Sequence, residues 1–104
     1  MNSVIPLDDQ QITTKIGAFC RRWKVRELSL FGSVVRDDFG PDSDVDVLVS
    51  FAPEAMWSYW ELVDARSELR GVFGRDVDLI EERSLRNPYR RRAILRDKKV
   101  LYAQ

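Results

Sequence analysis

The sequence predicts a single α+β domain in which helices pack on a small mixed β-sheet. Strand-like alternation occurs over 26–31, 44–51 and about 76–80, and helical periodicity occurs before, between and after these segments. A length of 104 residues fits one domain, with enough chain for a hydrophobic core without disulfides. We therefore expect residues 1–104 to form one domain with the order helix, strand, turn, strand, helix, strand and helix.

The first part of the chain predicts a helix over 8–23 and a short strand over 26–31. Asp8 and Asp9 follow a proline and suit an N-cap and a first helical turn. An apolar stripe at helical spacing follows, formed by Ile12, Ile16, Phe19 and Trp23. The strand ends at Gly32, "SVVRDDF" favours one or two helical turns, and "GPDS" at 40–43 is typical of a turn.

Residues 44–51 give the clearest strand pattern. One face of this strand carries Val45, Val47, Val49 and Phe51, and the other face carries Asp44, Asp46 and Leu48. The third strand repeats the pattern, with Val77 and Leu79 on one face and Asp76, Asp78 and Ile80 on the other. Both strands are therefore expected to present carboxylates opposite their apolar face.

Helices are expected over 54–70 and 84–96, and a short strand in "KKVLYAQ". Gly71 and Gly74 would close the first helix, and Pro88 suits the first turn of the second. The expected core contacts of the first helix are Trp57, Trp60 (or Tyr59), Leu62, Leu69 and Val72. Three aromatic residues within four positions cannot all face one core, so one of them is expected on the surface or in an interface.

Composition excludes several classes of protein. The one cysteine, Cys20, cannot form an internal disulfide, and no apolar run approaches the roughly 20 residues that span a bilayer. We therefore expect a cytoplasmic protein, with Cys20 in the core and no membrane partner. The absence of histidine excludes Ser-His-Asp catalysis and typical zinc sites, and no P-loop motif occurs.

Charge is distributed unevenly along the chain. Residues 1–82 hold 9 Lys/Arg and 16 Asp/Glu, whereas residues 83–104 hold 8 Lys/Arg and one acid. A basic segment suits nucleic acid, nucleotide phosphates or an acidic partner. Alternatively, it is a solvated helix face that neutralises the acidic body. Nucleic-acid binding is possible but not favoured, and steep salt dependence would identify it.

Asp44 and Asp46 lie two positions apart in a strand, which places both carboxylates on one face about 7 Å apart. Such a pair is unfavourable unless a cation lies nearby, and Mg²⁺ is typically held by one or two carboxylates together with substrate phosphates. Asp78 is a third strand carboxylate. Three converging carboxylates predict a metal-assisted phosphoryl or nucleotidyl transfer site, although an exposed acidic strand face would show the same local pattern.

Gly32 and Ser33 follow the first strand and open the expected helical turn. Glycine lets the backbone approach a phosphate closely, backbone N–H groups bind it, and the serine hydroxyl adds one hydrogen bond. Gly-Ser pairs are common in turns, but a Gly-Ser pair followed after ten residues by Asp-x-Asp is much rarer. The combination therefore favours a nucleotide site over an ordinary turn.

These motifs resemble the polymerase-β-like nucleotidyltransferase superfamily, and within it the minimal nucleotidyltransferase (MNT) family. The resemblance extends over nearly the whole chain through "LFGSVVR", "SDVDVLV", "GRDVDLI" and "RRAILRDKKVLY". It implies the nucleotidyltransferase fold. It also implies that Asp44, Asp46 and Asp78 are catalytic Mg²⁺ ligands, and that Gly32, Ser33 and Arg36 bind the nucleotide.

The resemblance further implies a function. The family is similar to antitoxins encoded beside HEPN-domain toxins, which are typically ribonucleases, and such antitoxins transfer AMP from ATP to a toxin tyrosine within a complex. The alternative is a non-catalytic antitoxin that neutralises its partner by binding alone. The chain departs from the family where "VVRDDFG" replaces Ala-Arg-Gly after the serine, which places Asp37 and Asp38 near the expected phosphate site.

Overall fold

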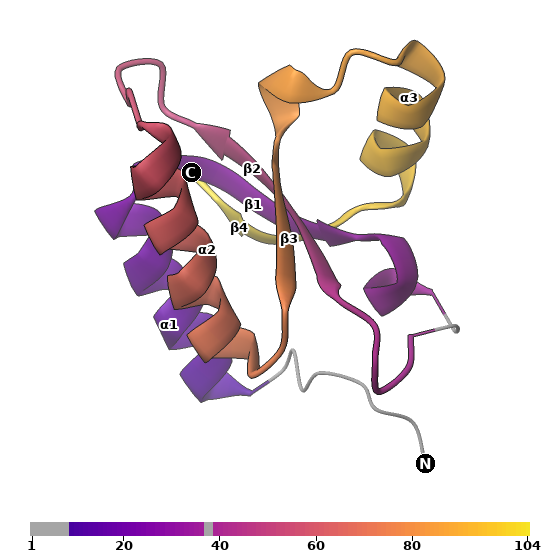
Figure 1. Cartoon of the computed structure of the whole chain (residues 1–104), viewed down its shortest axis with the longest axis horizontal. Helices are drawn as coiled ribbons and strands as arrows, with labels where there is room; N and C mark the ends of the chain where they lie inside the picture. Colours follow the sequence, from indigo (N-terminus) through magenta and orange to yellow (C-terminus); the bar gives the residue numbers. More distant parts are fainter. Residues whose placement is uncertain (1–8, 37–38) are drawn as a thin grey trace.

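The computed structural model describes residues 9–36 and 39–104 and shows a four-stranded sheet with helices on both faces (Figure 1). The predicted α+β class and the order of elements are confirmed. The elements are α1 (Gln10–Arg22), β1 (Val25–Phe31), the 3-10 turn η1 (Gly32–Val35), β2 (Val45–Phe51), α2 (Tyr59–Phe73), β3 (Val77–Glu81), the 3-10 turn η2 (Glu82–Ser84), α3 (Pro88–Asp97) and β4 (Lys99–Ala103).

The sheet has the strand order β3-β2-β1-β4. β2 pairs in parallel with β3, while β1 pairs antiparallel with both β2 and β4, so the sheet is mixed as predicted. In this register Phe31 on β1 lies opposite Asp46 on β2, and Asp46 lies beside Asp78 on β3. The end of β1 and the starts of β2 and β3 therefore meet in one region of the sheet.

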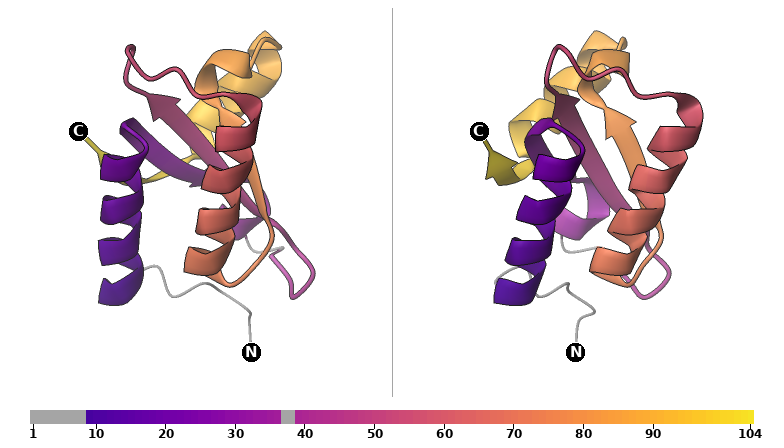
Figure 2. Two further views of the ribbon diagram at one scale, coloured as in Figure 1. Left: turned by 60° about the vertical axis from the view of Figure 1, so that its left-hand side comes forward. Right: turned by 90° about the vertical axis from the view of Figure 1, so that its left-hand side faces the viewer.

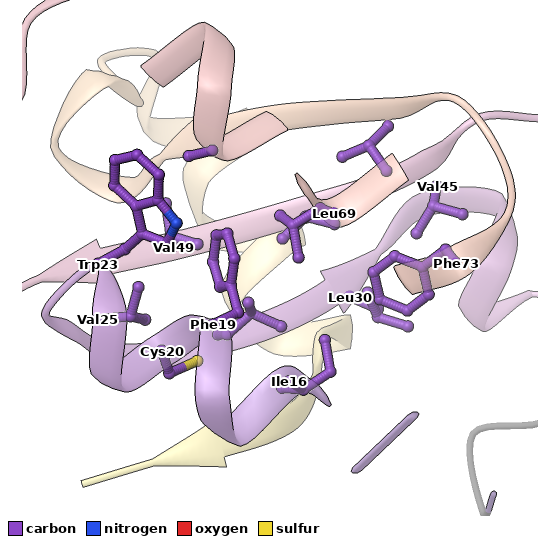
Figure 3. Packing of buried hydrophobic residues seen from close by; sticks show 14 of the residues in the cluster. Ile16, Phe19, Cys20, Trp23, Val25, Leu30, Val45, Val49, Leu69 and Phe73 are labelled. Carbon is purple, nitrogen blue, oxygen red and sulfur yellow. The ribbon is translucent and has the colours of Figure 1, made fainter. Parts of the chain in front are cut away.

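α1 and α2 lie side by side on one face of the sheet (Figure 2). Strand alternation points Val45, Val47 and Val49 toward these helices, where they are fully buried. Phe19 of α1 and Leu69 of α2 pack into the same cluster (Figure 3). This cluster is the main hydrophobic core and anchors the strands that carry the acids.

α3 lies on the opposite face of the sheet (Figures 1 and 2). It packs there through a second, smaller cluster formed by Phe31, Leu48, Leu85 and Ile94, with Ile80 and Leu95 at its margin. Asp46 and Asp78 lie two positions before Leu48 and Ile80 on the same strands, so each acid shares the face of that apolar residue. The predicted division of both strands into an apolar and an acidic face is confirmed.

The start of α2 differs from the prediction. The helix begins at Tyr59 rather than at 54, because Ser58 and Glu61 form a capping box in which each side chain accepts a hydrogen bond from the other residue's backbone N–H. Trp57 precedes the helix and packs edge-on against Trp23, while its indole N–H donates to the Trp23 carbonyl.

Trp60 and Tyr59 are 74% and 71% exposed, so the prediction that either one contacts the core was wrong. The later start turns both residues away from the sheet, and the core stripe of α2 is Leu62, Ala65, Leu69, Val72 and Phe73. The expectation that one of the three aromatic residues lies on the surface is confirmed.

Other boundaries shift by a few residues. Asp9 caps α1 by accepting from the Gln11 N–H, whereas the Asp8 prediction lies outside the described residues. Gly74 ends α2 with a φ of +67°, while Gly71 lies inside the helix. α3 begins at Pro88 rather than at 84, with the proline in the first turn as predicted. Cys20 is buried in the core, also as predicted.

Among residues 9–36 and 39–104, no helix combines the length and the apolar composition needed to cross a membrane.

Candidate active site

Asp46 and Asp78 are register partners on the parallel strands β2 and β3. Paired residues of neighbouring strands point to the same face, about 4.8 Å apart along the hydrogen-bonding direction. Asp46 is half-buried and Asp78 is exposed. Asp44 is also exposed and immediately precedes β2. The third strand thus lies beside 44–51, the arrangement that the three carboxylates need in order to converge.

The electrostatics of Asp46 link the three acids. The pKa of the Asp46 carboxyl is raised by burial first, then by the negative charges of Asp78 and Asp44, and the cations Arg36 and Arg90 oppose this effect. The carboxylates are therefore close enough to repel one another. A cation bound between them would relieve that repulsion.

In the conformation described for residues 9–36 and 39–104, no three acidic or thiol side chains already form a metal-binding group. The donor set nevertheless fits Mg²⁺, because it consists of carboxylate oxygens alone and carries an excess of negative charge. Asp44 and Asp78 are exposed, so their side chains are free to rotate toward Asp46. The residues therefore fit the ion without forming a closed cage.

Gly32 brings the backbone against Asp46. Its φ of +74° turns the chain from β1 into η1, a conformation that side-chain-bearing residues rarely adopt. A Cβ atom at this position would stand 2.2 Å from the Asp46 Oδ2 atom and 3.2 Å from its Cγ. Only glycine fits here, and Ser33 follows half-buried in η1.

Arg75 holds the turn that leads into β2. Its guanidinium donates to the carbonyls of Gly40 and Ser43 at 2.8 and 2.9 Å and stacks 4.4 Å from the centroid of the Phe39 ring. The first N–H of β2, on Val45, donates to the Asp76 carbonyl at 2.9 Å. Sequence reasoning missed this support, because nothing local to Arg75 indicates a partner 32 residues earlier in the chain.

A cleft of about 520 Å³ opens between η1 and α3, beside Asp46. The described residues that line it are Phe31, Gly32, Val35, Arg36, Asp46, Arg90, Ala93, Ile94 and Asp97. Three predicted site residues, Gly32, Arg36 and Asp46, thus meet in one cleft. Asp78 is on the β3 side of Asp46, because β2 separates it from β1 and the cleft wall. Ser33 directly follows the lining residue Gly32, and Asp44 lies two positions before Asp46.

Arg90 is a cleft residue that the sequence analysis did not single out. It shares the cleft-facing side of α3 with Ala93, Ile94 and Asp97. These residues are spaced by three, four and seven positions, which is the signature of one helix face. That spacing was the available signal, but it does not reveal which element the face opposes.

The basic C-terminal segment is partly neutralised within the described residues. Four of its eight cations pair with acids, in the pairs Arg83–Glu81, Arg91–Glu82, Arg96–Asp97 and Lys98–Glu27. This favours the interpretation that the segment balances the acidic body. Nucleic-acid binding stays the alternative that is not favoured.

Comparison with known proteins places this geometry in a family. The model of the nucleotidyltransferase domain matches residues 12–101. A Methanocaldococcus jannaschii relative, provisionally named a protein adenylyltransferase, is 34% identical over 76 residues, covering 73% of this chain and 76% of its own. Protein adenylyltransferase MntA of Thermococcus cleftensis is 39% identical over 66 residues, covering 64% of this chain and 65% of its own.

Solved structures share the fold. A provisionally named minimal nucleotidyltransferase superposes with a TM-score of 0.73 at 28% identity, covering 94% of this chain and 98% of that one. A toxin–antitoxin crystal structure with AMP-PNP gives a TM-score of 0.71 at 23% identity, covering 88% of this chain and 73% of that one. Because the family model spans most of the chain and the match to the minimal structure is nearly end to end, the chain belongs to the nucleotidyltransferase domain family as one of its minimal members.

Proposed function

We propose that this nucleotidyltransferase is an antitoxin that transfers AMP from ATP to a tyrosine hydroxyl of a HEPN-type toxin, depends on Mg²⁺ and forms a hetero-oligomer with that toxin. The observation that carries the proposal is the register pair Asp46–Asp78 beside the Gly32 bend. Support comes from relatives named protein adenylyltransferase and from a similar fold in a complex of an MNT antitoxin with the tri-AMPylated HEPN toxin of Shewanella oneidensis.

Asp44, Asp46 and Asp78 would hold the magnesium ion. Bound there, Mg²⁺ would neutralise charge on the triphosphate and on the departing pyrophosphate. Gly32 and Ser33 would bind phosphate oxygens through backbone N–H groups and the serine hydroxyl. Arg36, on the wall of the same cleft, would add a charge-assisted hydrogen bond.

The positions of β2 and β3 suggest that the nucleotide and the acceptor tyrosine approach the acids from different sides. The cleft adjoins Asp46 on the β1 side, where η1 and α3 would hold the nucleotide. Asp78 is exposed on β3, an edge strand, where an incoming tyrosine could reach it. In the proposed reaction Asp78 accepts the hydroxyl proton, the tyrosine oxygen bonds to the α-phosphorus, and the bond from that phosphorus to the bridging oxygen breaks to release pyrophosphate.

The test is incubation of the purified protein with α-labelled ATP, Mg²⁺ and the product of the adjacent gene. We expect label on a tyrosine of that product, and no label when EDTA replaces Mg²⁺. The Asp46→Asn and Asp78→Asn variants should lose transfer, while Asp64→Asn, which removes an exposed acid on α2 away from the site, should retain it. Equal labelling by Asp46→Asn and the unaltered protein would refute the catalytic proposal.

A surface on α2 favours a second candidate function, neutralisation by binding alone. Three exposed apolar side chains of α2, together with Met56 in the segment just before the helix, define the α2 patch: Met56 (86%), Tyr59 (71%), Trp60 (74%) and Val63 (38%). Contiguous exposed apolar surface of this kind marks interaction sites in soluble proteins. If binding alone suffices, the toxin will be silenced without ATP, and Asp46→Asn will neutralise it as well as the unaltered protein does.

A further inference from the structure

The basic residues of 83–104 differ in what they contact. Arg83, Arg91, Arg96 and Lys98 each form an ion pair. Within residues 9–36 and 39–104, no ion pair or hydrogen bond engages the side chains of the other four, which are Arg86, Arg90, Arg92 and Lys99. Arg90 alone among these four lines the cleft beside Asp46. Its charge is therefore available to a ligand in that cleft.

Arg90 stands on the wall opposite Gly32. It projects from the first turns of α3, whereas Gly32 and Arg36 come from the β1–η1 side. The guanidinium is close enough to act electrostatically on the Asp46 carboxylate. One turn further along α3, the small side chain of Ala93 also faces the cleft and leaves space beside Arg90.

The N-terminus of α3 has few free backbone N–H groups for an anion. Asn87 caps the helix, and its Oδ1 atom accepts hydrogen bonds from the N–H groups of Tyr89 and Arg90 at 2.9 and 3.1 Å. These backbone donors are already used. The anion-binding group that α3 contributes to the cleft is therefore the guanidinium of Arg90.

We propose that Arg90 binds the β- and γ-phosphates of the nucleoside triphosphate from the α3 wall, so that the substrate is held between η1 and α3. The inference rests on the proposed function for the identity of the nucleotide. A triphosphate beside three carboxylates requires positive charge, and a guanidinium donates two hydrogen bonds to a phosphate in a fixed fork. When the bond to the α-phosphorus breaks, negative charge grows on the pyrophosphate, where Arg90 stabilises it.

The test compares Arg90→Gln with Arg92→Gln, a matched control that removes the same charge from an exposed position on α3 that does not line the cleft. Dissociation constants for AMP-PNP and for AMP are measured by calorimetry with Mg²⁺. We expect Arg90→Gln to weaken AMP-PNP binding about tenfold or more, as loss of a charge-assisted hydrogen bond implies. AMP, which lacks the β- and γ-phosphates, should bind almost unchanged, and Arg92→Gln should match the unaltered protein for both ligands.

Arg90→Lys keeps the positive charge but cannot donate two parallel hydrogen bonds to one phosphate. It should therefore bind AMP-PNP more tightly than Arg90→Gln does, but less tightly than the unaltered protein. Unchanged AMP-PNP affinity in Arg90→Gln would overturn the inference. So would equal losses for AMP-PNP and AMP, or no binding of AMP-PNP by the unaltered protein. If the expected affinities are found but no protein is labelled from ATP, the proposed function fails while the role of Arg90 in binding stands.

Discussion

Gly32 lies directly against the carboxylate of Asp46, with room for a hydrogen but not for a Cβ atom, which would stand 2.2 Å from Oδ2. Gly32→Ala should therefore displace Asp46 and also strain a backbone held at a φ of +74°. We expect a loss of about 1–3 kcal/mol of unfolding free energy, the usual scale of such strain, together with loss of nucleotide binding. Denaturant unfolding and calorimetry measure the two effects.

Gly71→Ala is the control for this substitution. Gly71 lies within α2, and a Cβ atom built there meets nothing within 4 Å. Alanine should stabilise the protein by about 0.5–1 kcal/mol, since it restricts the unfolded chain and favours helix. Equal effects of the two substitutions would contradict the close packing of Gly32 on Asp46.

Asp46 should make the stability of the free protein depend on pH. Burial first, and then the charges of Asp78 and Asp44, raise the pKa of its carboxyl above the ordinary 3.8. The folded state therefore binds this proton more tightly than the unfolded state does. The resulting stabilisation is present at low pH and is lost as pH rises through the folded-state pKa.

Asp46→Asn removes that charge. In EDTA at pH 7 the variant should melt at a higher temperature than the unaltered protein, and the difference should shrink as pH falls below the folded-state pKa of Asp46. Thermal melts between pH 4 and pH 8 (roughly the window from the ordinary carboxyl pKa upward) measure this difference. If the difference in melting temperature grew toward low pH, the pKa of Asp46 would be lowered by folding and not raised.

Trp60 and Trp57 should respond in opposite ways to alanine. Trp60 is 74% exposed, so Trp60→Ala should change unfolding free energy by less than about 0.5 kcal/mol while weakening toxin binding through the α2 patch. Trp57 packs on Trp23 and Phe51, and its loss should cost about 3 kcal/mol. Chemical unfolding and titration with the partner separate the two effects. Full partner affinity in Trp60→Ala would remove Trp60 from the interface.

Cys20 should be unreactive in the folded protein. Burial raises the pKa of its thiol to about 12, although the charge of Arg21 acts in the other direction, so the reactive thiolate is almost absent at neutral pH. A thiol reagent should modify Cys20 only after unfolding in denaturant. Rapid modification of the native protein would mean that the core around α1 opens readily.

The order of elements and the acidic strand faces were predictable because alternation and helical spacing are local signals. Asp46 and Asp78 could be assigned to one face from the residues around them, such as Val45, Val47 and Val77. Their pairing in register depends on which strand lies beside which, and local patterns do not determine this. The family resemblance implied that Asp44, Asp46 and Asp78 belong to one site, but it gave no register. Position 32 was identified by its motif, but its 2.2 Å approach to Asp46 required coordinates.

The errors have different origins, one in a local signal and two in tertiary structure. Trp60 looked like a core residue because the helix was started at 54, whereas the Ser58–Glu61 capping box, visible in "SYWE", sets the start and turns Trp60 outward. Arg90 was indistinguishable from its arginine neighbours because only the packing of Ile94 on Phe31 and Leu48 orients α3. Arg75 was missed for the same reason, since its partners lie in a distant turn.

The ribosome synthesises the two walls of the cleft at different times, because η1 lies early in the chain and α3 lies near its end. A ribosome that has released the chain only through α2 has delivered Gly32 and Asp46, but neither Asp78 nor Arg90. The part of the cleft formed by Gly32 and Asp46 then exists, but the wall formed by α3 is missing. β4 must also still pair with the free edge of β1. Translation arrested before residue 88 would release a fragment that carries the Gly-Ser and Asp-x-Asp motifs yet lacks an enclosed pocket, so the motifs alone do not identify a competent product.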